Sequence, residues 1–188
     1  DVRNFNYPVQ LAAQERGSTA CDLLYAATKE EYTYSPENEP HISLNFTHRL
    51  AKVILKFVNM EKEPLEVSDV RIEGMQTAAS FNIQTDVLTV DESSVATINP
   101  YHNATTGFYE AIILPSALTD SYKVSFVLDD REKEWIFTNL DIALPQFHKG
   151  YSYTFALYID DSGFVEMGRL ENVEGGNSSA PWEDGSSE

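Results

Sequence analysis

The residues best able to do chemistry in this chain are one cysteine, four histidines and two pairs of adjacent aspartates. The lone Cys21 can form neither an internal disulfide nor a CxxC pair, and its neighbours carry no signature of a catalytic cysteine. The sequence has no GxSxG, HExxH or GxxxxGK[ST] motif. Because catalysis needs several converging groups, the sequence predicts no enzyme active site and no bound cofactor.

The four histidines are too widely separated in the chain to predict a metal site. His41, His48, His102 and His148 lack the close pairing of ligands that zinc sites show. His48 falls within an apolar strand-like run, on the apolar parity. We therefore interpret it as a buried histidine held by hydrogen bonds.

Two aspartate pairs, Asp129–Asp130 and Asp160–Asp161, leave two interpretations open. Carboxylate oxygens are the ligands that calcium prefers, although the spacing here is not that of an EF-hand loop. Both pairs also follow strand-like runs, where Asp is common in tight turns. The turn interpretation is favoured over calcium binding.

The charge of the chain excludes several classes of partner. Its 188 residues carry 30 acidic and 13 basic side chains, with a formal net charge of −17. An acidic chain without a basic cluster is a poor ligand for nucleic acid or anionic membrane. No apolar run is long enough to span a bilayer, so we expect no direct membrane insertion.

The elements that must position these residues are strands, because apolar residues recur with a period of two along most of the chain. The clearest case is Tyr151–Ile159, whose odd-numbered residues are all apolar or aromatic. The predicted strands are Ile42–Phe46, Arg49–Val58, Leu65–Ile72, Ala79–Ile83, Val87–Val90, Phe108–Leu114, Tyr122–Leu128, Trp135–Leu140, Tyr151–Ile159 and Phe164–Met167. The aspartate pairs would close two hairpins. This spacing predicts an all-β fold, a β-sandwich of about seven or more strands.

Three local patterns refine this prediction. The apolar parity changes between Leu44–Leu50 and Val53–Phe57, which predicts a β-bulge near Ala51 or Lys52. Short helical turns are expected only in Val9–Arg16 and Thr19–Thr28. The chain then divides into an N-terminal segment, residues 1–40, a β-sandwich domain, residues 41–170, and a flexible acidic Gly/Ser-rich tail, residues 171–188.

Several segments, in order, resemble the fimbrillin-like family of Bacteroides-group bacteria, which includes type V pilins and related lipoprotein adhesins. The strongest is Leu44–Phe57, LNFTHRLAKVILKF, where an aromatic, a His, a Leu, a small residue and a Lys lead into a strand. The other matching segments are FNYP at 5–8, DLLYA at 22–26, AIILP at 111–115, KGYSYTFAL at 149–157 and PWEDG at 181–185. The resemblance covers most of the chain.

The resemblance implies transthyretin-like β-sandwich domains, with residues 1–40 as the end of a preceding β domain. It also implies export to the cell surface, as an outer-membrane lipoprotein or within a fimbrium, with any anchor upstream of Asp1. The function it implies is that of a structural or adhesive fimbrial subunit. Its partners would be other fimbrial subunits, together with surface glycans or proteins.

Assembly by strand exchange is a further implication of the resemblance, following cleavage by an Arg-specific protease. Arg3 and Arg16 are the candidate cleavage sites. The candidate donor strand is formed by Phe164, Val165, Met167 and Leu170, which precede the tail. An unpaired strand edge would be the acceptor.

An alternative function is that of a surface lipoprotein that binds carbohydrate or another ligand and does not polymerise. Carbohydrate binding would require an exposed aromatic platform. Tyr101, Trp135, Tyr151 and Trp182 are its candidate members.

Overall fold

The regular structure of the described residues is β throughout. The computed structural model describes residues 5–14, 21–28, 42–140, 143–160, 162–163 and 165–175. These residues form three sheets of three or more strands and two two-stranded ribbons, and no α-helix occurs among them. The all-β class predicted from the sequence is therefore confirmed. Within the same residues, no helix is long and apolar enough to cross a membrane.

The largest layer is a five-stranded sheet with the order β15-β14-β4-β9-β8. Its strands are β4 (Ala51–Asn59), β8 (Tyr101–Asn103), β9 (Phe108–Ile113), β14 (Tyr151–Ile159) and β15 (Val165–Gly175). The two central strands, β4 and β14, run parallel, and the other pairs are antiparallel. Strand β14 lies between β4 and β15 and is buried along most of its length.

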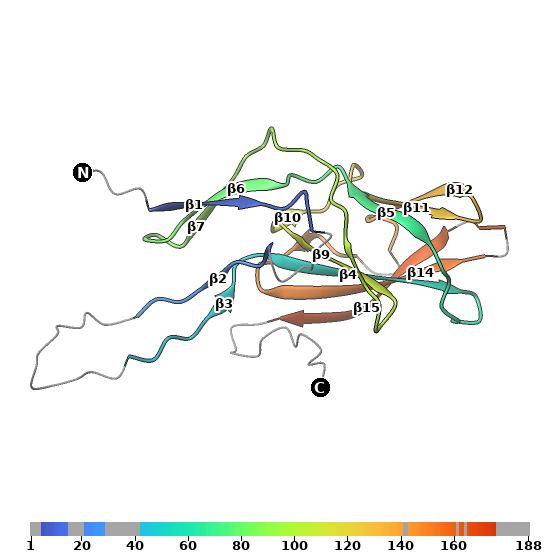
Figure 1. Cartoon of the computed structure of the whole chain (residues 1–188), viewed down its shortest axis with the longest axis horizontal. Helices are drawn as coiled ribbons and strands as arrows, with labels where there is room; N and C mark the ends of the chain where they lie inside the picture. The colour runs from blue at the N-terminus through green and yellow to red at the C-terminus, as the bar shows by residue number, and fades with distance from the viewer. Residues whose placement is uncertain are drawn as a thin grey trace, which may run out of the picture.

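A three-stranded sheet, β12-β11-β5, packs across one face of the large sheet (Figure 1). Its strands are β5 (Ser68–Glu73), β11 (Lys123–Leu128) and β12 (Arg131–Ile136). The apolar face of each sheet points into the space between them. The shared core includes Val53, Leu55, Phe57, Ile72, Val124, Phe126, Trp135, Phe137, Phe147, Phe155 and Leu157. Burial of each such side chain contributes about 1.5–3 kcal/mol.

A second, smaller core lies beneath a separate sheet with the order β1-β6-β7. Its strands are β1 (Asn6–Gln10), β6 (Ala78–Asn82) and β7 (Val87–Val90). This core is formed by Val9, Leu11, Leu50, Ala79, Phe81, Ile112 and Leu114. Ile112 belongs to the small core while its neighbours Ala111 and Ile113 belong to the large one. Strand β9 therefore contributes one face to each core.

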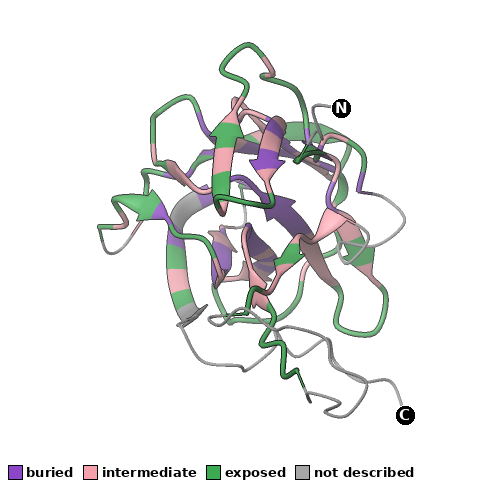
Figure 2. Ribbon diagram, turned by 90° about the vertical axis from the view of Figure 1, so that its left-hand side faces the viewer, coloured by how far each residue is buried: buried purple, intermediate pink, exposed green. Residues whose placement is uncertain are grey.

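Two short ribbons complete the described structure. One pairs β2 (Leu24–Tyr25) with β3 (Thr47–His48), and the other pairs β10 (Ser116–Ala117) with β13 (Gln146–Phe147). Figure 2 shows that the exposed residues lie mainly on loops, on the outer strands and on the projecting segments that lead from the first ribbon.

The strongest sequence patterns located strands correctly. Val87–Val90 and Tyr151–Ile159 have the predicted bounds. Both predicted hairpins are present, as β11–β12 and β14–β15. Asp129 and Asp130 turn between β11 and β12 with positive φ angles of 48° and 59°, which Asp tolerates better than most residues.

Four local predictions were wrong. Residues 42–46 form no strand, because no described strand pairs with them. Strands occupy part of both predicted helical segments: residues 9–10 lie in β1 and residues 24–25 lie in β2. Strand β12 ends at Ile136 and begins at Arg131, earlier than predicted.

The predicted bulge at Ala51 or Lys52 is also wrong. The register of β4 with β9 and β14 is uninterrupted there. The chain instead bends at Arg49 and Leu50, between β3 and β4. The apolar parity changes because Leu50 points into the small core, whereas Val53 points into the large one.

The division into residues 1–40, 41–170 and 171–188 stays a prediction. Strand β1 of the first segment pairs with β6 of the second along five residue pairs. Strand β15 continues past Leu170 to Gly175, within the predicted tail.

Candidate functional site

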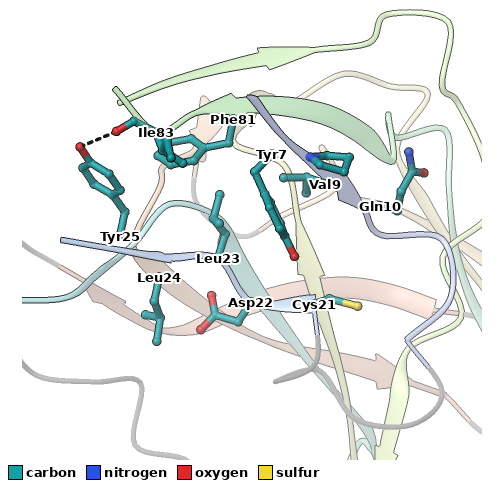
Figure 3. A pocket seen from close by; sticks show the side chains of 11 residues that line it. Tyr7, Val9, Gln10, Cys21, Asp22, Leu23, Leu24, Tyr25, Phe81 and Ile83 are labelled. Atoms are coloured by element: carbon teal, nitrogen blue, oxygen red, sulfur yellow. Dashed lines mark hydrogen bonds between the residues drawn. The ribbon is translucent and has the colours of Figure 1, made fainter. Parts of the chain in front are cut away.

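A groove of about 480 Å³ lies between β1 and residues 21–25 (Figure 3). Tyr7, Leu23 and Phe81 point into the space between the two segments, whereas Asp22 and Leu24 point to the other side. The lining residues are Tyr7, Pro8, Val9, Gln10, Cys21, Asp22, Leu23, Leu24, Tyr25, Phe81 and Ile83. Only one of them, Asp22, is charged. The groove is therefore suited to an apolar or neutral occupant.

One side of the groove is the edge of β1 that faces away from β6 and has no strand partner among the described residues. The carbonyl of Phe5 accepts from the N–H of Ile83 at 2.9 Å, and the N–H of Leu11 donates to Thr77 at 2.8 Å. Backbone groups alternate in direction along an antiparallel strand, so the odd-numbered residues of β1 face β6. Pro8 and Gln10 then direct their backbone groups to the opposite side. In the described part of the chain, β1 pairs with β6 alone.

Pro8 fits this geometry. Proline lacks an N–H, so within sheets it is confined to positions where no ladder bond is lost. At Pro8 the missing donor lies on the free edge, so pairing with β6 is unaffected. The same residue limits uncontrolled pairing at the edge, a common protection of exposed strands.

The two walls of the groove are joined by Arg49 and Tyr25. Arg49 binds the carboxylate of Asp86 through both Nε, at 2.5 Å, and Nη2, at 2.9 Å. Its guanidinium also lies 5.0 Å from the centre of the Tyr25 ring. The Tyr25 hydroxyl donates to the Ile83 carbonyl at 3.0 Å. Because Asp86 and Ile83 lie in the β6–β7 turn region, these contacts fix β2 relative to the small sheet.

His48 contacts the wall of the groove that is formed by residues 21–25. Its Nδ1 lies 2.7 Å from Oδ2 of Asp22, and both side chains are largely buried. The Arg49 N–H donates to the Leu23 carbonyl at 2.9 Å. The sequence interpretation of His48 as a buried, partnered histidine agrees with this arrangement. The motif residues Asp22 and His48, 26 positions apart in the chain, thus meet beside the groove.

Cys21 lies at one end of the groove as a free thiol. Its Sγ is 3.7 Å from the Ala13 carbonyl, to which the thiol donates. Partial burial raises the pKa of the Cys21 thiol above its usual range, because burial penalises the thiolate. The group is therefore a protonated, weakly reactive thiol near neutral pH.

The candidate donor residues Val165, Met167 and Leu170 belong to β15, an edge strand of the large sheet that does not line the groove. Val165 is buried and Leu170 packs against the large core, both in β15. Strand β15 pairs with β14 along nine residue pairs. Phe164, the Met167 side chain, and the candidate cleavage sites Arg3 and Arg16 lie outside what the structure describes.

The candidate aromatic platform does not include Trp135, which is only 2% exposed. Its indole N–H donates to the Asn139 carbonyl, and its ring packs on Phe137 and Phe155. Trp135 is thus a core residue, and its candidacy was wrong. Tyr101 and Tyr151 are half-buried on β8 and β14, two strands separated by β4 and β9. Trp182 lies outside the described residues.

Among the described residues, no three His, Cys, Asp or Glu side chains come together as metal ligands. Asp160 accepts hydrogen bonds from the backbone and hydroxyl of Ser162, as expected of a turn residue. Sequence reasoning did not find the groove or the Arg49–Asp86 contact. The one available signal was Phe5–Leu11, a run without charge that ends in a strand pattern.

The described residues thus form a β-sandwich in which one edge of β1, unpaired among them, borders a groove with a single charged lining residue, Asp22. The fimbrillin-like family model matches residues 1–182. The chain belongs to the fimbrillin-like family. Membership assigns it a fimbrial or adhesive role at the cell surface, and places it with structural proteins and adhesins, not enzymes.

Two solved structures have a similar fold. A candidate cell adhesion protein from Bacteroides uniformis aligns with a TM-score of 0.76 and 23% identity, covering 93% of this chain and 67% of that one. A candidate cell adhesion protein from Bacteroides ovatus aligns with a TM-score of 0.55 and 16% identity, covering 71% of this chain and 48% of that one. The chain thus spans about half to two thirds of these structures. No match was found among curated protein sequences.

Proposed function

We propose that this chain is a subunit of a bacterial surface fimbria, and that its groove accepts a β-strand from a neighbouring subunit. The observation that supports this most directly is the edge of β1 beside the groove, which no strand of the described residues pairs with. A strand laid there would receive backbone hydrogen bonds from Gln10 and donate to the Pro8 carbonyl. Its side chains would contact the apolar lining, as in other cases of strand addition.

Side-chain contacts around the groove support the proposal of a preformed acceptor. Arg49–Asp86 and Tyr25–Ile83 connect the β2–β3 side of the groove to the β6–β7 turn region. Tyr7 and Ile83 remain about half exposed at its mouth, at 57% and 49%. Exposed apolar side chains beside an unpaired edge mark an interaction surface.

The proposal includes the donor suggested by the sequence, Phe164, Val165, Met167 and Leu170 of a neighbour. Since β15 pairs with β14 in its own subunit, donation requires that β15 leave this sheet. Cleavage near Arg3 or Arg16, lipid-anchored export and the transthyretin-like classification belong to the same proposal. They rest on the family resemblance. Of the two cleavage sites, only Arg3 leaves β1 (Asn6–Gln10) in the chain, so the groove as acceptor requires cleavage there.

The groove is tested by charging its mouth. Tyr7→Lys and Ile83→Lys introduce charge at exposed positions, where the fold should tolerate it. We expect each to remove detergent-resistant oligomers and surface fimbriae from the native host. Ile136→Lys, at a 41% exposed position on β12, is the matched control and should keep them. Unchanged oligomers in the groove variants, with unaltered circular dichroism, would refute the groove as acceptor.

The donor is tested by locking β15 to β14. Ala156 and Arg169 lie opposite each other in this pair. A disulfide between cysteines at these positions, in a Cys21→Ser background, would hold β15 in its own sheet. Oligomers should then form only under reducing conditions. Oligomers that persist in the oxidised protein would exclude β15 as the donor.

A further inference from the structure

An apolar arm projects from the body of the molecule beside the groove (Figure 1). We define the arm as residues 24–28 and 42–48, which include β2 and β3. Four of its large apolar side chains are about half exposed: Leu24 at 50%, Ile42 at 48%, Leu44 at 48% and Phe46 at 57%. Leu24 pairs with His48, so these two side chains share one face of the β2–β3 ribbon, and Ile42, Leu44 and Phe46 have the same parity as His48 in the sequence. We call Leu24, Ile42, Leu44 and Phe46 the apolar stripe.

The stripe belongs to a longer run of alternating apolar residues, whose other end is buried. The even-numbered residues from Ile42 continue through His48, whose side chain is 13% exposed, to Leu50, which is fully buried. A period-two apolar pattern is typical of a strand with one face covered. Ile42, Leu44 and Phe46 nevertheless keep about half of their surface exposed. This exposed apolar surface is available to a covering partner.

Charge indicates that the partner can be a second copy of this chain. At a net charge of −17, two copies repel each other over most of their surfaces. The arm and the groove are exceptions. Residues 42–60 contain no Asp or Glu, and residues 5–11 contain no charged residue. Asp22, the one acid in the groove lining, is paired with His48.

The arm also has the length and the exposed backbone that a strand added to the edge of β1 would require. Ile42–Phe46 is a strand-length segment with no strand partner in the described residues, and β1 presents an unpaired edge. Unlike β15, the arm needs no release from a sheet of its own before it can pair. Its apolar stripe could cover the groove while its backbone bonds to Pro8 and Gln10.

We propose that Ile42–Phe46 of one copy lies in the groove of a second copy, and that the exchange is reciprocal. The arm begins at β2, which forms one wall of the groove, so both surfaces lie at one end of the molecule. Two copies related by a two-fold axis can exchange both contacts at once and so close the pair, whereas a head-to-tail contact that does not close builds a filament. This inference rests on the proposed function, because it requires that the groove accept a strand. While the arm of a second copy lies in the groove, β15 of a neighbour cannot lie there, so the closed pair and fimbrial assembly through the groove exclude each other.

The native Cys21 in the groove makes the contact measurable. The test mixes the unmodified chain, which has Cys21 alone, with the Asn45→Cys/Cys21→Ser variant, which has only the arm thiol. A disulfide between residues 21 and 45 can then form only between copies. We expect peptide mapping of the oxidised mixture to find this disulfide. Its absence would overturn the inference.

The reciprocal geometry is tested by the Asn45→Cys variant that retains Cys21. Within one copy these residues are too far apart for a disulfide. The pairing of Tyr25 with Thr47 places residue 45 opposite or beyond residue 27. That is about 20 Å from Cys21 at roughly 3.3 Å per residue, whereas a disulfide needs Cα atoms about 4.4–6.8 Å apart. A covalent dimer is expected on a non-reducing gel. A ladder of larger species would overturn the closed pair.

Light scattering of the reduced chain gives a second, independent measurement. We expect a concentration-dependent dimer that weakens at least about tenfold in Leu44→Lys and Phe46→Lys, because a charge would enter an apolar contact. Met60→Lys, at a 50% exposed position beyond the far end of β4, is the control and should dimerise normally. A monomer at all concentrations would overturn the inference.

Failure of this inference is distinguishable from failure of the proposed function. If Tyr7→Lys removes fimbriae in the host but no residue 21 to 45 disulfide forms, the groove accepts a different strand and only the arm is excluded. If neither effect occurs, the groove is not an acceptor and both proposals fail.

Discussion

Trp135 lies directly against Gly168, so closely that a Cβ at residue 168 would be 1.9 Å from Cζ2 of the indole. The Asn139 carbonyl accepts from both residues, from the indole N–H at 3.1 Å and from the Gly168 N–H at 3.2 Å. Gly168 is in β15 and Trp135 is in β12, so this contact joins the edges of the two sheets. The contact holds β15 in its own subunit. Donation of β15 to a neighbour would therefore require that this contact break.

Gly168→Ala should lower the free energy of unfolding by about 1–3 kcal/mol or more, because the added methyl cannot fit beside the ring. Urea denaturation measures the loss. In a Trp135→Phe background the clashing ring is smaller, so the same substitution should cost at least about 1 kcal/mol less. Equal costs in the two backgrounds would show that the indole does not limit this position.

The Arg49–Asp86 contact should be specific to the guanidinium. Arg49→Lys keeps the charge but loses the two-point hydrogen bond and the planar contact with Tyr25. Asp86→Asn is the suitable partner substitution, because residue 86 has φ 57° and Asn tolerates that conformation. A double-mutant cycle should give a coupling free energy of about 1 kcal/mol, reduced at high salt. A coupling near zero would mean that the walls of the groove are held by other contacts.

A change at the backbone nitrogen should affect the stability of the chain strongly at residue 7 and weakly at residue 8. By the alternation of β1, the Tyr7 N–H faces β6, whereas residue 8 faces the free edge. Tyr7→Pro should therefore destabilise the chain by about 1–3 kcal/mol through a lost ladder bond and an unpaired acceptor. Pro8→Ala should change the stability by at most about 1 kcal/mol. Thermal and urea unfolding check both, and the reverse order of effects would contradict the register.

Cys21 should react slowly at mildly alkaline pH. Burial raises the pKa of its thiol, so at pH 8 a smaller fraction is thiolate than in an unfolded peptide, and alkylation is slower. The rate with iodoacetamide, followed by mass spectrometry, should rise steeply as the pH increases towards the raised pKa. Urea should abolish the difference. Equal rates in the folded and unfolded chain at pH 8 would contradict the burial of this thiol.

The arm shows a limit of sequence reasoning. The alternation of Ile42, Leu44 and Phe46 predicted a strand with one covered face, whereas these residues are exposed and form no strand. It wrongly predicted a strand, because a strand also needs a hydrogen-bonded neighbour, and none of the described residues supplies one. Side-chain periodicity carries no information about which backbone will lie alongside.

The sequence by itself determined the β class, the hairpins at Asp129–Asp130 and Asp160–Gly163, and the family. Alternation, turn chemistry and short motifs are local, so they survive without knowledge of the fold. Only the tertiary structure decided that Trp135 is core, that Asp22 meets His48, and that β1 and Leu23 enclose a groove. Those contacts join residues that are 26 to 58 positions apart or lie in different sheets, as Arg49 with Asp86 and Tyr25 with Ile83 show. Their proximity follows from how the sheets pack, which no local pattern encodes.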